Sequence, residues 1–242
     1  MEIGFLVETT KRLLTGIPLM LQLWALSVAI GAVLAVAIAL LRLSGVKPLE
    51  WLASFYVFVF RGTPLLVQMF LIYYGLSQFP GIRQSFLWVF LRQPYWCAIL
   101  AFILNTAAYG SEIVRGGLLA VPFGEVEAAR AFGMSGFLLF RRVVFPIALR
   151  QALPAYGNEI ILMIKATSLA SIITLMEVTG IAQRLISETF RAVEVFICAG
   201  AIYLVINFVI SRAVAWLEHR LSPHLRGAAE RAQPALLSAG KI

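Results

Sequence analysis

Long apolar runs, each about as long as a bilayer is thick, constrain this 242-residue chain more than any other feature. The first run covers residues 17–41, and only Gln22 and Ser27 interrupt it. A helix of about 20 residues crosses the hydrocarbon core, and in lipid a single segment must pair all its own backbone groups, so such runs form helices. Hydrophobic residues make up 61% of the chain and charged residues 13%, against roughly a quarter charged in soluble proteins. We therefore predict an all-α integral membrane protein.

Polar segments divide the chain into five expected spans and their connections. The spans are expected at about 17–41, 52–76, 95–114, 157–176 and 195–217, so that residues 1–222 form one transmembrane domain. Pro64 removes a backbone donor and Gly62 loosens the helix, so the second span should be kinked. Residues 3–14 predict a short helix on the membrane surface, and residues 77–94 predict an external loop with an aromatic segment at the interface. The polar tail, 223–242, is expected to be disordered.

The distribution of Lys and Arg predicts which side of the membrane each segment faces. Five spans put the two termini on opposite sides, and cytoplasmic segments carry the excess of basic residues. One side has twelve, namely Arg42, Lys47, Arg115, Arg130, Arg141, Arg142, Arg150, Arg212, Arg220, Arg226, Arg231 and Lys241. The other side has six, namely Lys11, Arg12, Arg83, Arg92, Arg184 and Arg191. The connection between the third and fourth spans and the C-terminus are therefore expected in the cytoplasm, and the N-terminus outside.

Three further features of the sequence exclude other classes of protein or site. The net charge of +8 does not indicate nucleic-acid binding, because the basic residues are scattered among apolar runs. Cys97 and Cys198 lie among apolar neighbours inside expected spans, so they should be small buried side chains rather than disulfide partners or metal ligands. The first apolar run is too long for a cleavable secretory signal, so we expect this span to remain in the mature chain.

The connection between the third and fourth spans, about 118–154, contains sequence typical of soluble helices. Residues 127–131 are mostly helix formers, and Gly133 supplies a residue that can take a positive φ and end a helix. We predict two short helices with a bend between them, bounded by Pro146 and Pro154. A compact helical loop of this kind usually docks on a partner. An ordinary amphipathic cytosolic loop is the alternative.

The spacing of residues in this connection resembles the signature loop of ATP-binding-cassette (ABC) importer permeases. Glu127-Ala128-Ala129 is followed after three residues by Gly133 and, after nine more, by an aliphatic-x-apolar-Pro group that ends at Pro146. Val143 and Phe145 of this group replace the usual isoleucine and leucine, but both stay apolar. Three more stretches, 61–68, 108–117 and 153–159, resemble the polar amino acid branch of these permeases. Two others, 86–97 and 165–171, are similar to octopine and nopaline permeases, with histidine and arginine permeases close behind.

The resemblance covers roughly residues 15–220 and implies the five-span core of a type I importer permease in a bacterial inner membrane. It implies an ATP-driven importer of basic amino acids or opines, with two permease chains, two ATPases and an external solute-binding protein. A pair of different permease chains is favoured over a homodimer. The chain has no phosphate-binding glycine loop ending in Lys-Ser or Lys-Thr, so it is not expected to be an enzyme or to bind a cofactor. ATP and Mg²⁺ would bind to the partner ATPase.

The resemblance also assigns a mechanical role to the signature loop. The helix around residues 127–132 would insert into a cleft on the ATPase, and closure of the ATPase would move it as a rigid lever. The residues implicated in this coupling are Glu127, Ala128, Ala129, Arg130, Gly133 and Pro146.

Polar residues in the third span form a stripe that predicts part of a substrate pathway. Charged groups at bilayer depth cost at least a few kcal/mol, so they usually face the bundle interior or water. Asn105, Tyr109 and Glu112 follow at i, i+4 and i+7 on one helix face. Glu112 could attract a cationic amino group, or it could pair with Arg115 three residues later.

Polar residues near the start of the fourth span are the other pathway candidates. Asn158 and Lys165 share a helix face, whereas Glu159 points elsewhere. Glu159 could contact a cationic substrate or cap the N-terminus of the helix. Lys165 could neutralise a carboxylate on another helix or extend to the interface rather than bind substrate. A structural role is expected for Arg61, Gly62 and Pro64.

Two other classes of protein remain as alternatives. An ion-coupled secondary transporter of amino acids predicts about ten or more spans with internal repeats, and the sequence has neither. A membrane scaffold without transport would leave the signature loop without a role. Dependence of uptake on a partner ATPase, as opposed to sensitivity to a protonophore, separates the first two classes.

Overall fold

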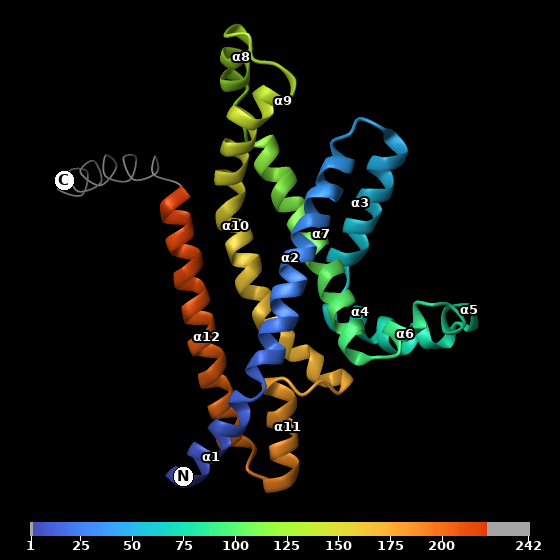
Figure 1. The fold of residues 1–242 in the computed structure, drawn as a ribbon, viewed down its shortest axis with the longest axis vertical. Helices are drawn as coiled ribbons and strands as arrows, with labels where there is room; N and C mark the ends of the chain where they lie inside the picture. Colours follow the sequence, from blue (N-terminus) through green and yellow to red (C-terminus); the bar gives the residue numbers. More distant parts are fainter. Residues whose placement is uncertain (1, 222–242) are drawn as a thin grey trace, which may run out of the picture.

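The computed structural model of the protein describes residues 2–221, and all regular structure in this part of the chain is helical (Figure 1). The α-helices are α1 (Ile3–Leu14), α2 (Ile17–Arg42), α3 (Lys47–Gly62), α4 (Leu65–Phe70), α5 (Pro80–Arg83), α6 (Trp88–Leu91), α7 (Pro94–Leu119), α8 (Phe123–Ala131), α9 (Gly136–Leu139), α10 (Phe145–Ala166), α11 (Val178–Thr189) and α12 (Ala192–Leu221). Two π-turns, Leu71–Gly75 and Phe140–Val144, and two 3₁₀ segments, Leu76–Gln78 and Thr167–Ile173, complete the order. The all-α prediction is confirmed. The expected tail, 223–242, lies outside the described residues.

Up to five membrane spans fit the lengths and compositions of these helices. Within the described residues, three helices are long and apolar enough to cross a membrane: Ile3–Arg42, which joins α1 to α2, and α7 and α12. Two bent pairs raise the count to five. These are α3 with the segment from Leu65 to Gln78, and the segment from Gly136 to Ile173 with α11.

Helix α7 lies at the centre of the bundle, and this position explains why most of its side chains are buried. It packs along α2 on one side and along α10 on the other, and α12 packs on α10. Phe102 of α7 is fully buried, in a core cluster with Leu23, Met69 and Met163 from three other elements. Cys97 and Cys198 are both buried and free, as predicted.

At the position of the expected kink in the second span, the chain breaks into two helices that meet at 105°. Thr63 is extended, with φ −119° and ψ 144°, and Pro64 has no N–H to continue the helical ladder. The side chain of Gln68 takes over part of this pairing, since its Nε2 donates to the carbonyl of Phe60 at 2.8 Å and to that of Thr63 at 3.0 Å. Both carbonyls would otherwise be unpaired, which is costly at bilayer depth.

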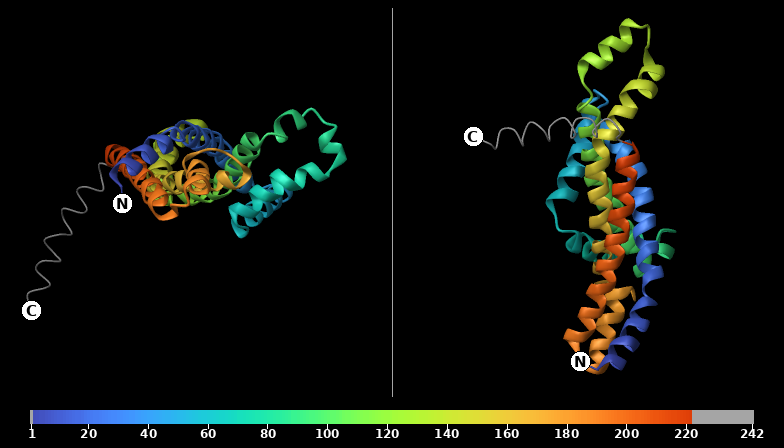
Figure 2. Two further views of the ribbon diagram at one scale, coloured as in Figure 1. Left: turned by 90° about the horizontal axis from the view of Figure 1, so that it is seen from below. Right: turned by 90° about the vertical axis from the view of Figure 1, so that its left-hand side faces the viewer.

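Beyond this break, α4 packs on α7, and the following segment with α5 and α6 leaves the bundle sideways as an arm, which Figures 1 and 2 show from different sides. The arm carries exposed aromatic side chains, including Phe79, Phe86 and Phe90, which are 59%, 78% and 47% exposed. Residues 77–94 therefore do form a projecting aromatic segment. Its position relative to a membrane stays a prediction.

The two short helices predicted for residues 118–154 are only half right. Helix α8 is short, but α9 continues through the π-turn into α10, so the second helix reaches Ala166. Pro146 lies in the first turn of α10, directly after the π-turn Phe140–Val144, and Pro154 lies inside α10, so neither proline bounds the continuous helix. Packing on α7 and α12 keeps the helix continuous across Pro154 despite the missing hydrogen bond. The helix that contains the expected fourth span therefore begins well before residue 157.

Helix α1 was expected to lie alone on the membrane surface, and the structure instead packs it into the bundle. It contacts α11 and α12, and the Leu13 side chain is fully buried. Arg191, at the start of α12, donates to Glu2 at 3.1 Å and lies 4.1 Å from the centroid of the Phe5 ring. Figure 2 shows α1, α11 and the first turns of α12 together at the end of the molecule opposite α8.

Candidate functional site

The bend after α8 forms a rigid tip at one end of the bundle. The chain reverses at Gly133, whose φ of +81° favours glycine. The N–H of Gly133 donates to the carbonyl of Arg130 at 2.9 Å, and that of Met134 to the carbonyl of Ala129 at 3.0 Å. These two bonds make up a Schellman cap, which ends the helix at a fixed angle. The sequence predicted this use of Gly133.

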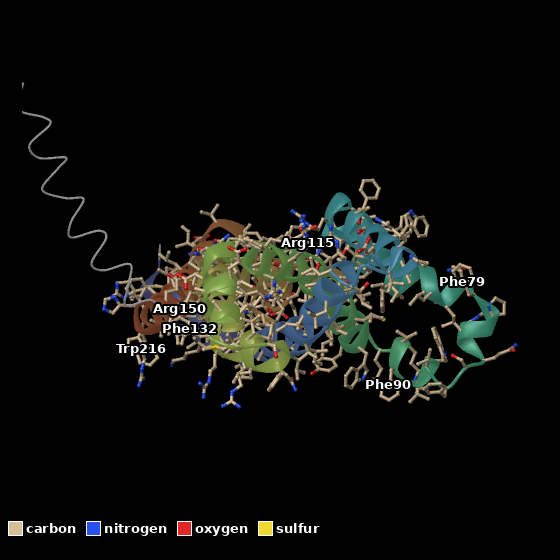
Figure 3. All side chains as sticks on the ribbon, turned by 90° about the horizontal axis from the view of Figure 1, so that it is seen from above. Phe79, Phe90, Arg115, Phe132, Arg150 and Trp216 are labelled. Carbon is tan, nitrogen blue, oxygen red and sulfur yellow. The ribbon has the colours of Figure 1, made fainter. Side chains whose placement is uncertain are left out.

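The tip exposes large apolar side chains among charged ones. Phe132, labelled in the end-on view of Figure 3, is 85% exposed, and Phe123 and Phe137 are 69% and 74% exposed. Glu127 and Arg130 are also exposed, while Ala129 is buried against the rest of the loop. An apolar surface with a polar surround of this kind is typical of a protein–protein contact.

A cavity of about 250 Å³ lies between the α3–α4 break, α7 and α10. Its walls are formed by Thr63, Pro64, Leu65, Asn105, Tyr109, Glu159, Leu162, Met163 and Ala166. Three of the six predicted pathway residues, Asn105, Tyr109 and Glu159, therefore come together although two helices supply them. The volume is slightly below the roughly 300–1,000 Å³ of pockets for drug-sized ligands, so it suits a smaller one.

Glu159 is the unusual group in this cavity, because it is a buried carboxylate without a direct partner. The residue is 9% exposed, and the described residues provide it with neither a hydrogen bond nor an ion pair within 4.0 Å. It lies in the middle of α10, so the alternative role as an N-terminal helix cap is wrong. The Oη of Tyr156, one turn earlier, is also buried without a hydrogen-bond partner in the described part of the chain. An unpaired buried charge costs several kcal/mol, so this site is poised to receive a cation.

The other cavity polar groups are already oriented by hydrogen bonds and ring contacts. Asn105 donates from Nδ2 to Oε1 of Gln68 at 3.3 Å, so the residue that caps α3 also fixes Asn105. The Oη of Tyr109 lies 3.5 Å from the carbonyl of Arg61. The Arg61 guanidinium lies over the Tyr109 ring, with Cζ 5.3 Å from the centroid.

Glu112 lies outside the cavity, in a cluster with three arginines. Arg42 of α2 contacts its Oε1, Arg115 donates to its Oε2 at 2.9 Å, and Arg61 approaches at 3.8 Å. The expected pairing with Arg115 is thus present, and two more helices join it. Because three guanidinium groups offset its charge, Glu112 is poorly placed to attract a cationic ligand.

Asn158 and Lys165 are exposed on α10 and do not line the cavity. Lys165 borders a shallow hollow of about 410 Å³ with Ser168 and Asn207, and no described carboxylate lies within 4.0 Å of it. The predicted neutralisation of an inter-helix carboxylate by Lys165 is therefore wrong for the described residues.

Sequence reasoning missed Gln68, which organises the site, and Glu177, which caps α11 outside it. Gln68 was part of a recognised stretch but received no role, although its position four residues after Pro64 is within reach of the carbonyls that the proline leaves unpaired. Glu177 is fully buried, caps α11 through Thr179 and Gly180, and accepts a hydrogen bond from Tyr203 Oη at 2.8 Å. An acidic residue directly before a helix was the available signal.

Comparisons with known proteins give one consistent result. Residues 18–223 match the family described as binding-protein-dependent transport system inner membrane component. The chain is 62% identical to the octopine transport system permease protein OccM of Rhizobium meliloti, over 92% of this chain and 91% of the relative. It is 57% identical to the nopaline transport system permease protein NocM of Agrobacterium fabrum, over 93% and 94% of the two chains. It is 39% identical to the histidine/lysine/arginine/ornithine transport system permease protein HisM of Escherichia coli K12, over 88% and 90%.

A solved structure agrees with these relatives. The crystal structure of an amino acid ABC transporter with histidines matches with a TM-score of 0.81 at 36% identity, covering 91% of this chain and 99% of that chain.

Proposed function

Because the chain belongs to the family of binding-protein-dependent transport system inner membrane components, we propose that it moves a basic amino acid or an opine through the cavity at Glu159. The chain is the permease subunit of a polar amino acid ABC importer with the type I fold, and it is a multi-pass inner-membrane protein. A permease subunit is not itself an enzyme.

The unpartnered carboxylate of Glu159 carries the proposal for the cargo class. The names of the relatives include octopine, nopaline, histidine, lysine, arginine and ornithine. These compounds share a basic group and at least one carboxylate. A buried carboxylate gains most from such a cation, because the pair removes a charge that is otherwise costly to bury. Asn105 and Tyr109 would hold the polar remainder of the cargo by hydrogen bonds.

The other predicted pathway residues have different parts in this proposal. Asn158 and Lys165 lie on the exposed face of α10 and would line the route toward a second permease chain. Glu112 would act through the arginine cluster rather than by touching cargo. A pair of different permease chains remains our preference over two copies of this chain.

We propose that α8 docks into a cleft on a partner ATPase through Glu127, Ala128, Ala129 and Arg130. Gly133 would fix the angle of the docked helix, and Pro146 would start the helix that carries the motion inward. From residue 136 to Met163 the chain is helical, which is about 40 Å at 1.5 Å per residue. One helical segment therefore connects the docking tip to the cavity. ATP and Mg²⁺ would bind only to the ATPase.

The proposed docking of α8 on the ATPase also implies an orientation of the chain in the membrane. The ATPase would be reached only if α8 is cytoplasmic, and the excess of Lys and Arg on that side supports this. The C-terminus would then be cytoplasmic and the N-terminus external, where a periplasmic solute-binding protein would dock on the end formed by α1 and α11. Labelling of an Ala131→Cys variant by a membrane-impermeant maleimide from the periplasm alone would refute the orientation.

The experiment for the cargo site is Glu159→Gln in the importer reconstituted with its ATPase, partner permease and binding protein. This change keeps the shape and removes the charge. Loss of one partner of a buried pair costs about 2–5 kcal/mol, so uptake of L-arginine should need roughly 30-fold more cargo or stop. The matched control, Glu50→Gln at the far end of α3, should transport normally. Wild-type uptake by Glu159→Gln would remove Glu159 from the pathway.

The class of transporter is tested in the same vesicles. An ATPase partner unable to hydrolyse ATP should abolish uptake, and a protonophore should leave it intact. The reverse result would favour an ion-coupled secondary transporter.

A further inference from the structure

Arg61 lies near Glu112 and next to the cavity that contains Glu159. It sits in the last turn of α3, beside the break that forms one wall of the cavity. Its Nη1 is 3.8 Å from Oε1 of Glu112, and its guanidinium covers the Tyr109 ring. The side chain is 45% exposed, so it is not locked by packing.

Glu112 does not need Arg61 as a partner. Arg42 contacts one carboxylate oxygen, and Arg115 donates to the other from Nε at 3.1 Å and Nη2 at 2.9 Å. The 3.8 Å approach of Arg61 is too long for a hydrogen bond. Arg61 is therefore the surplus cation of this cluster.

Glu159, by contrast, has no cation of the described residues within 4.0 Å. Tyr109 lines the cavity together with Glu159, so the ring that Arg61 covers faces the same space. Arg61 also lies two residues before Thr63, the first residue of the α3–α4 break that lines the cavity with Glu159. Arg61 thus makes the same two interactions, with a carboxylate and an aromatic ring, that a guanidinium or ammonium cargo would make.

We propose that Arg61 is the resident counter-ion of the cavity, which offsets Glu159 while the cavity is empty and moves fully onto Glu112 when the cation of the cargo arrives. This inference rests on the proposed role of Glu159. Arg61 would offset the Glu159 charge only in part while the cavity is empty, because it does not contact the carboxylate, and the cation of the cargo would complete the pairing by direct contact. Arg61 would lower the affinity for cationic cargo and so allow its release, and a neutral analogue would not displace it.

The test measures equilibrium binding of radiolabelled L-arginine to the assembled transporter, with L-citrulline as the neutral isostere. Arg61→Gln should bind arginine more tightly, because the competitor is gone. Glu112→Gln removes the alternative partner of Arg61 and should weaken arginine binding about tenfold, within the five- to 150-fold range typical of coupled sites. Competition by citrulline should change little in either variant. Arg92→Gln, an exposed arginine on the arm, controls for the loss of a positive charge.

Two double variants separate exchange from a general change in the electrostatic field. Arg61→Gln with Glu112→Gln should restore tight arginine binding, because no arginine remains to be redirected. Arg115→Gln with Glu112→Gln has the same net charge but keeps Arg61, so its arginine binding should stay weak. Equal recovery in both double variants would overturn the exchange and leave only a field effect.

Other outcomes are equally decisive. Weaker arginine binding by Arg61→Gln alone would overturn the proposal. This result could be interpreted directly, because Arg61 is half-exposed and its substitution, unlike that of Glu112, should not disturb folding. If Glu159→Gln abolishes arginine binding while changes at Arg61 and Glu112 have no effect, the cargo site at Glu159 is supported and the counter-ion role of Arg61 is refuted. If Glu159→Gln binds arginine normally, the proposed cargo site itself fails.

Discussion

A single methyl group at Gly117 should weaken the contact between the two helices that flank the signature loop. A Cβ at this position would lie 2.7 Å from the carbonyl oxygen of Ala148 and 2.9 Å from the Cβ of Ala152, on α10. Ordinary contacts to a Cβ are 3.4–4 Å. Both obstacles are backbone or backbone-attached atoms, which cannot rotate away, so α7 and α10 must move apart. Overpacking of this size typically costs 1–3 kcal/mol.

The adjacent Gly116 supplies a matched control for Gly117→Ala. A Cβ on Gly116 meets nothing within 4 Å, so Gly116→Ala gains only helix propensity, up to about 1 kcal/mol in a helix interior. Gly117→Ala has the same gain, and the difference between the two variants isolates the packing cost. We expect Gly117→Ala to melt about 2–4 °C lower per kcal/mol than Gly116→Ala in detergent.

A functional measurement on the same pair completes the test. The contact at Gly117 fixes the angle at which α7 and α10 leave the loop, so Gly117→Ala should also lower the amount of cargo moved per ATP hydrolysed. Equal melting temperatures for the two variants would refute the reasoning, because they would mean that α7 and α10 tolerate separation without cost.

Three further predictions concern the tip and the break. Gly133→Val forces a β-branched residue to φ +81°, which should cost about 1–3 kcal/mol locally. Uptake by this variant should fall, while its insertion into the membrane stays intact. The control Gly124→Val, whose side chain enters open space, should transport better than Gly133→Val. Phe132→Ala should weaken ATPase co-purification without lowering the melting temperature, since the ring is 85% exposed, and an unchanged yield of ATPase would contradict docking. Gln68→Leu leaves the carbonyls of the α3 end unpaired and should lower the melting temperature by the equivalent of about 1–3 kcal/mol; a stable Gln68→Leu protein would show that water replaces the amide.

The spans that could be predicted are those whose signal is contained in one continuous segment. Residues 17–41 are an almost uninterrupted apolar run, and α2 coincides with this run to within one residue at either end. The second span could not be predicted in the same way. Pro64 indicates a disturbance of the helix, but whether the result is a kink or a 105° turn depends on whether another group can pair the freed carbonyls. Gln68 does so, and that contact forms only in three dimensions.

The boundaries of α10 show the opposite failure, in which local signals were given too much weight. Proline and glycine predicted an end near Pro154, yet the helix continues to Ala166. The loss of one backbone hydrogen bond costs less than the burial that α10 gains against α7 and α12. Tertiary packing therefore decided this boundary, and sequence periodicity cannot reveal it.

In the candidate site too, the residues that could be predicted are those whose signal lies within one helix. The helical spacing of Asn105 and Tyr109 was enough to place them on one face, and both face the cavity. The same spacing also included Glu112, but this residue lies almost two turns, or about 10 Å, further along α7 than Asn105 and contacts Arg42 and Arg61 outside the cavity. Arg42 and Arg61 are about 70 and 50 positions from Glu112 in the chain. Only the folded structure therefore brings these charges together.

The continuity of α10 changes the mechanical argument for the loop. A stiff loop closed by prolines at both ends would pass motion to the spans only through its two joints. The helix from Gly136 onward contains Glu159, so displacement of α8 would reach the carboxylate through the single bend at Gly133. The same helix carries Leu162, Met163 and Ala166 in the cavity wall. A movement of α10 relative to α7 would therefore separate Glu159 from Asn105 and Tyr109, so that the cation loses its hydrogen-bonding partners in the same step that opens the cavity.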